Sequence, residues 1–207
     1  IQLLLAVFLL HALVTGGHLM SPDGEIMYRM AESIAYRSHT QVLPLEADIT
    51  TGFVDPQLRG QTFATAPGKE PGTFYAQYLP LQPLLSAPFL WVAKLLEGPL
   101  AEPFASALPR KTMTNSYLHP LPEKEFEAAA FRRGFLVLLF NPLVAALSAV
   151  VLARMGRLLT GSRQAGIIAG ALWAFGTMAW PHSRTYFTEP LAGLMVLLAL
   201  DQLIRWN

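Results

Sequence analysis

The sequence predicts an all-α, multi-pass membrane protein with about four transmembrane helices and one large external loop that contains interfacial helices. Three observations support this class. Hydrophobic residues make up 53% of the chain and charged residues only 14%, whereas roughly a quarter of residues are charged in soluble domains. Four stretches approach the roughly 20 apolar residues needed to cross a hydrocarbon layer of about 30 Å. Most of the proline and turn-forming residues lie in one long segment after the first stretch.

Composition also excludes several classes of function. The formal net charge is +1 and no run of lysine and arginine occurs, so we expect no nucleic-acid partner. Cysteine is absent, which excludes disulfides and cysteine-ligated metals. The chain starts at Ile1 and ends inside an apolar stretch, so we expect a fragment of a longer protein that forms a single membrane unit over residues 1–207.

The four predicted spans are residues 1–20, 134–153, 164–181 and 189–206. The first is longer than the roughly 7–15 apolar residues of a signal peptide and has no obvious cleavage site, so an uncleaved span is expected. Asn141-Pro142 should kink the second span because proline removes a backbone donor. Gly166, Gly170 and Ala174 recur at four-residue spacing in the third span, which predicts close approach of a neighbouring helix.

Residues 74–96 can be interpreted in two ways. The run is long enough to span, but it contains Pro80, Pro83 and Pro88 and the aromatic residues typical of the headgroup zone. If it lies in the interface, Arg154, Arg157 and Arg163 fall on the cytoplasmic side, in line with the positive-inside rule. We favour this interpretation, in which residues 21–133 form the external loop of an inner or plasma membrane protein.

Two carboxylates, Asp23 and Glu25, follow directly after the first span. Residues 24–37 have a helical period that separates an apolar face (Ile26, Met27, Met30, Ile34) from a polar face (Glu25, Arg29, Glu32, Tyr36). Such a helix is expected to lie flat on the membrane surface.

A structural and a functional interpretation compete for this acidic pair. Asp23 can cap the helix, and Glu25 can pair with Arg29 four residues later. Alternatively, partial desolvation raises the proton affinity of a carboxylate and suits it to general-base catalysis, and the Asp-x-Glu spacing suffices to hold a divalent cation. For Glu25 alone we prefer the structural interpretation; for Asp23 both remain open.

Basic groups occur in two other parts of the predicted outer face. Lys69 precedes the run expected at headgroup depth, where its ammonium can pair with a lipid phosphate. The turn between the third and fourth spans contains His182, Arg184, Tyr186 and Glu189. Such a density of polar groups marks either a functional site or an aromatic rim of the membrane.

The order of these motifs resembles the lipid-linked-sugar glycosyltransferases of the C-type fold, in particular the protein mannosyltransferase and aminoarabinose transferase branch (glycosyltransferase family 39 and relatives). "DGEIMYRMA" is similar to the acidic motif after the family's first transmembrane helix. "GKEPGTFYAQYLPLQPLLSAPFLW", "EAAAFRRGFLVLL", "RMGRLLTGSRQAGIIAGAL" and "HSRTYFTEPLAGLMVLLAL" look like its later elements. The chain departs from the family at Gly24, where a second acid is common, and at Glu70-Pro71, and residues 95–127 have no counterpart.

The resemblance implies sugar transfer from a polyprenyl-phosphate donor to a protein, lipid or glycan acceptor at the extracytoplasmic face. It implies that Asp23 is the base, with Glu25 as a second acid, and that Lys69, His182 and Arg184 bind the donor phosphate. The resemblance establishes no particular cofactor and leaves metal dependence open, and a divalent cation at Asp23 and Glu25 is compatible with it. Two other classes remain open: a transporter or permease fragment, and a non-catalytic membrane scaffold.

Overall fold

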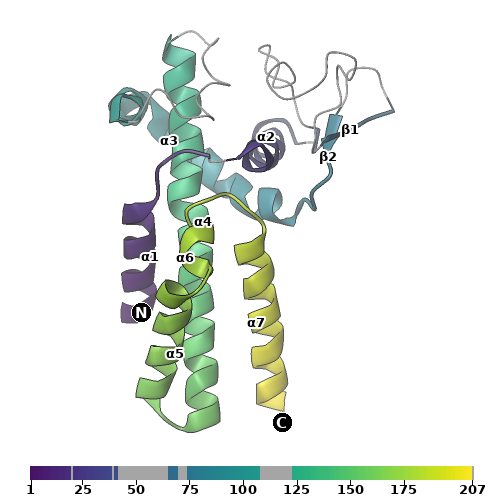
Figure 1. The fold of residues 1–207 in the computed structure, drawn as a ribbon. Coiled ribbons are helices and arrows are strands. Elements are labelled where there is room, and N and C mark those ends of the chain that lie inside the picture. Colours follow the sequence, from purple (N-terminus) through teal and green to yellow (C-terminus); the bar gives the residue numbers. More distant parts are fainter. Residues whose placement is uncertain (20, 39, 42–64, 70–73, 108–122, 207) are drawn as a thin grey trace. The chain divides into compact units, whose positions relative to one another are not determined.

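The computed structural model describes residues 1–19, 21–38, 40–41, 65–69, 74–107 and 123–206. The described part is mostly helical and contains two short strands (Figure 1). The rest of the predicted external loop, residues 39, 42–64, 70–73 and 108–122, lies outside the described residues, as do Met20 and Asn207. The chain divides into two compact units, residues 17–136 and residues 1–16 with 137–207.

The unit of residues 17–136 is built on α2 (Pro22–Arg37) and α3 (Leu81–Ala107), which pack against each other. An antiparallel hairpin of β1 (Thr65–Pro67) and β2 (Phe74–Ala76) pairs Ala66 with Tyr75. The apolar face of α2, at Ile26 and Met30, packs on Ala76 and Tyr78 at the end of this hairpin. The first turns of α4 (Glu123–Thr160) complete the unit.

The unit of residues 1–16 and 137–207 contains α1 (Gln2–Val14), the rest of α4, α5 (Arg163–Gly176), α6 (Ala179–His182) and α7 (Glu189–Trp206). In Figure 1, α1, α5 and α7 run alongside α4. A Cβ added to Gly166 would lie 2.2 Å from the Ala153 carbonyl oxygen, and one added to Gly170 would lie 2.5 Å from that of Ala149. The predicted close approach at these glycines is therefore confirmed, and its partner is α4.

Two of the described helices, α3 and α4, are long and apolar enough to cross a membrane. The predicted span at residues 134–153 lies inside α4, which continues as one helix through Pro142. The predicted span at residues 164–181 is divided into α5 and α6, and α7 matches residues 189–206. The first predicted span contains only the 13-residue helix α1, about 20 Å long, because the chain leaves the helix at Thr15 before two glycines.

Residues 74–96 differ from the expected single interfacial helix. Phe74–Ala76 is strand β2, and the helix extends from Leu81 to Ala107. Pro83 lies in the first turn of α3, where a backbone N–H has no partner within the helix, so it does not prevent the helix from starting there.

Candidate functional site

Asp23 lies in the first turn of α2. Ser21 is the N-cap, and its side chain accepts a hydrogen bond of 3.0 Å from the backbone N–H of Gly24. Of the two interpretations left open for Asp23, the helix cap is therefore excluded, because Ser21 takes that place. The Asp23 side chain is half-buried, and in the described part of the chain its carboxylate makes no hydrogen bond or ion pair. This carboxylate is thus available to a ligand.

Glu25, one turn further into the helix, has a different environment. It is 1% exposed, and it accepts hydrogen bonds from Arg29 Nε at 2.9 Å and from Arg133 Nη2 and Nε at 2.7 and 2.9 Å. The predicted pair with Arg29 is confirmed. Arg133, from the start of α4, adds a two-point contact with the carboxylate, a geometry that fixes both position and orientation.

These contacts set the protonation state of Glu25. Burial by itself raises the pKa of the carboxyl, but the charges and hydrogen bonds of Arg133 and Arg29 lower it more, to about 2. Glu25 is therefore ionised at neutral pH and has both oxygens occupied by arginines. Such a carboxylate is poorly suited to proton transfer or metal binding, and it is well suited to holding α2 against α4.

The first half of the polar face of α2 is therefore buried, whereas Glu32 is half-buried and Tyr36 is exposed. Glu25 and Arg29 are buried, and Tyr28 is completely buried with its ring 4.4 Å below the Arg133 guanidinium. The Tyr28 hydroxyl donates a hydrogen bond of 3.0 Å to Glu32. Ion pairs and an aromatic contact compensate the desolvation of these buried groups, and the position of α2 relative to a membrane stays a prediction.

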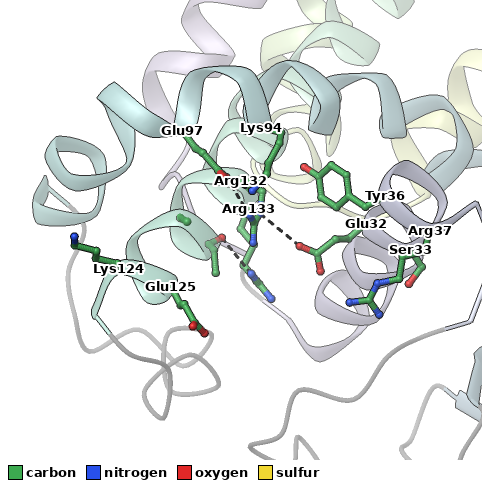
Figure 2. A pocket seen from close by; sticks show the side chains of 12 residues that line it. Glu32, Ser33, Tyr36, Arg37, Lys94, Glu97, Lys124, Glu125, Arg132 and Arg133 are labelled. Carbon is green, nitrogen blue, oxygen red and sulfur yellow. Dashed lines mark hydrogen bonds and ion pairs between the residues drawn. The ribbon is translucent and has the colours of Figure 1, made fainter.

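A pocket of about 620 Å³ opens between α2, α3 and the first turns of α4 (Figure 2). Its floor includes Arg132, which donates to Glu97 at 2.9 Å and lies 3.5 Å from Glu32; Glu97 also pairs with Lys94. Five basic and three acidic residues line the pocket: Arg37, Lys94, Lys124, Arg132 and Arg133, with Glu32, Glu97 and Glu125. None of them was among the predicted site residues.

Lys69 is exposed and lies directly after β1, in the hairpin that packs on α2. Asp23, Glu25 and Lys69 thus belong to the same unit. No hydrogen bond or ion pair joins Lys69 to either acid among the described residues.

His182 and Arg184 belong to the other unit. His182 ends α6 and lines a pocket of about 400 Å³ together with Trp173 of α5 and Glu189 of α7. Arg184 is half-buried, and its buried Nε has no hydrogen-bond partner among the described residues.

The turn that carries these two residues is attached to α1 by His11. This buried histidine is hydrogen-bonded through Nδ1 to Ser183 Oγ at 2.5 Å and donates from Nε2 to the Ala174 carbonyl at 3.2 Å. Trp180 meets its ring edge-on at 4.8 Å between centroids. His11 therefore positions the turn.

The predicted basic groups thus divide between the two units, and in the described ranges no three His, Asp or Glu side chains gather where they could hold a metal ion. Sequence reasoning missed Arg132, Arg133 and His11 as organising residues. The only signal for the arginines was their adjacency at the start of an apolar run, which equally fits a membrane-flanking pair. Comparisons with protein-family models, with curated proteins and with solved structures found no match to this chain.

Proposed function

We propose that this chain is part of an integral membrane glycosyltransferase that transfers a sugar from a polyprenyl-phosphate donor to an acceptor at the extracytoplasmic face. The observation that carries the proposal is the Asp23 carboxylate, half-buried and without a partner in the described part of the chain. It stands in the first turn of a helix that follows the apolar helix α1. The order of motifs after it, which resembles the C-type glycosyltransferases, supports the same function.

In the proposed reaction Asp23 accepts the proton of the acceptor hydroxyl or amine. The acceptor's lone pair forms the new bond to the anomeric carbon of the sugar. The bond from that carbon to the phosphate oxygen breaks, and its electron pair leaves with the lipid phosphate. The proton on Asp23 is then released to water, so atoms and charges balance.

Glu25 takes the role of a positioning residue in this proposal. Its ion pairs with Arg29 and Arg133 hold the start of α2, and a fixed carboxylate at Asp23 lowers the cost of reaching the reactive geometry. Lys69, His182 and Arg184 remain proposed partners of the departing phosphate. Cations stabilise such a leaving group most strongly where water is scarce.

A transporter is the alternative, and Asp201 is the observation that favours it. This carboxylate is completely buried within the apolar helix α7. However, it accepts hydrogen bonds from Arg154 and also pairs with Arg205 at 3.2 Å. An ion-paired carboxylate near the end of a helix has a sufficient structural role. Solute uptake by vesicles that lack lipid-linked sugar would support the transporter instead.

The test is a donor-dependent transfer assay on the full-length protein with a panel of polyprenyl-phosphate sugars. Loss of a general base costs about 10²–10⁴-fold in rate, so Asp23→Asn should abolish measurable transfer while leaving membrane insertion and the melting temperature unchanged. Glu102→Gln, at an exposed carboxylate of α3, is the matched control and should keep full activity. Transfer retained by Asp23→Asn would refute the role of Asp23.

A second test asks whether Asp23 and Arg184 lie on the same side of the membrane. Cysteines introduced by Asp23→Cys and Arg184→Cys should both react with a membrane-impermeant maleimide added to the outer side. Labelling from opposite sides would rule out a common site for the acid and the predicted phosphate ligands.

A further inference from the structure

The pocket between α2, α3 and the first turns of α4 is separate from Asp23. Its nearest lining residue on α2, Glu32, is nine positions after Asp23, which is about 13 Å along a helix axis. The hollow exists partly because Ala128 and Ala129 present only methyl groups to it. Its volume of about 620 Å³ is within the range of roughly 300–1,000 Å³ typical of small-molecule sites.

The charges of this pocket are not balanced. Five basic and three acidic side chains line it, an excess of two positive charges. Lys94, Arg132 and Arg133 are bound to glutamates. Arg37 and Lys124 are exposed and make no hydrogen bond or ion pair among the described residues. Glu125 is likewise exposed and unpaired in the described part of the chain, so these three lining groups carry a net charge of +1, and the two cations among them are available to a ligand.

The two available cations lie apart. Figure 2 shows Lys124 on one side of the pocket and Arg37 on the other, with Arg132 and Arg133 between them. A ligand that contacts both cations at once must therefore extend past the two arginines between them (Figure 2). The middle of the pocket offers charged donors on Arg132 and acceptors on Glu32 and Glu97, a mixture that suits hydroxyl groups because a hydroxyl both donates and accepts.

We propose that this pocket binds a carbohydrate-sized ligand that carries a phosphate group at each end and hydroxyl groups between them. Arg37 binds one phosphate and Lys124 the other. Arginine and lysine are the side chains that bind phosphate through charge-assisted hydrogen bonds. The site does not require Asp23 to be a base, so it stands apart from the proposed function.

The proposal is tested with the full chain in zwitterionic detergent by titration calorimetry. Fructose 1,6-bisphosphate is the probe, and glucose 6-phosphate and glucose are its one-phosphate and neutral counterparts. We expect saturable binding of the bisphosphate, binding of the monophosphate weaker by at least about tenfold, and no binding of glucose. Raising the salt concentration should weaken the binding, because the two cations are exposed.

Substitutions of Arg37 and Lys124 test whether each residue binds one of the two phosphate groups of the ligand. Arg37→Gln and Lys124→Gln should each weaken bisphosphate binding by about tenfold, and together by about a hundredfold, because separated sites act independently. Arg157→Gln, at an exposed arginine of the other unit, is the matched control and should leave binding unchanged. All variants should keep the melting temperature of the parent, since neither cation has a partner in the described fold.

Three results would overturn the proposal. The first is absence of bisphosphate binding at millimolar concentration, and the second is binding that is insensitive to both substitutions. The third is binding of phosphatidylglycerol vesicles that depends on Arg37 and Lys124 without any binding of the bisphosphate, which would make lipid headgroups the phosphate source. Asp23→Asn should bind the bisphosphate like the parent, so failure of sugar transfer and failure of this site are distinguishable.

Discussion

Replacing Glu25 by glutamine should be among the most destabilising single changes in the unit of residues 17–136. The carboxylate is 1% exposed and is shared by two buried arginines, Arg29 and Arg133. Its pKa of about 2, compared with 4.5 for an ordinary glutamate, corresponds to about 3 kcal/mol of stability at neutral pH. Removing one partner of a buried ion pair typically costs about 3–5 kcal/mol, because the remaining charge has no compensation.

The effect is measured as the midpoint of thermal unfolding of the full chain in detergent. A loss of about 3 kcal/mol corresponds to a decrease of about 6–12 °C for a protein of this size. Glu125→Gln is the control, because Glu125 is exposed and has no ion-pair partner in the described part of the chain; such surface changes stay within about 0.5 kcal/mol. Equal midpoints for Glu25→Gln and the parent would show that the two arginines do not depend on this carboxylate.

The same carboxylate predicts a pH dependence with a defined sign. The folded state holds Glu25 ionised down to about pH 2, whereas the unfolded chain binds the proton near pH 4.5. Acid therefore favours the unfolded state: the contribution of Glu25 is complete above about pH 4.5 and is lost as the pH falls toward 2. Glu25→Gln should remove this part of the acid sensitivity, and an unchanged acid profile would contradict the assignment.

Two further predictions follow from helix packing and from the place of α3. Gly170→Leu should destabilise the unit of residues 1–16 and 137–207 by about 1–3 kcal/mol or more, because a Cβ there meets the Ala149 carbonyl oxygen at 2.5 Å. Gly193→Leu is the control and should have the melting temperature of the parent, because the space around its Cβ is open. Equal melting temperatures for the two variants would show that the close contact at Gly170 is dispensable. A lysine at the centre of a membrane-spanning helix costs about 2.5–3.5 kcal/mol, and Lys94 lies at the middle of α3, so we expect this helix to lie in the membrane interface. Cysteines introduced by Leu79→Cys and Ser106→Cys should therefore be labelled by a membrane-impermeant reagent from the same side. Labelling from opposite sides would show that α3 crosses the membrane.

The sequence by itself determined the local features of this protein. Apolar composition, helical periodicity and four-residue glycine spacing predicted the α-helical class, the helices α2, α4 and α7, the close contact at Gly166 and Gly170, and the pair of Glu25 with Arg29. The helices and the Glu25–Arg29 pair depend on residues within one or two turns of each other, where the geometry of the helix sets which side chains meet, whereas the glycine spacing predicted a close contact but not its partner, α4. The sequence left open whether Asp23 caps α2, and the structure has Ser21 as the cap; serine and aspartate are almost equally good caps.

Only the tertiary structure decided the environment of the polar groups. Arg133 is 108 positions from Glu25, and His11 is 172 positions from Ser183, so no local pattern connects either pair. The tertiary contacts bury Glu25 and Arg29, which the amphipathic spacing had placed on the polar face of the helix. The same contacts create the charged pocket, because it forms only where three helices distant in sequence come together. Burial and long-range pairing, which depend on packing, decide whether a carboxylate is available for chemistry, as at Asp23, or committed to structure, as at Glu25.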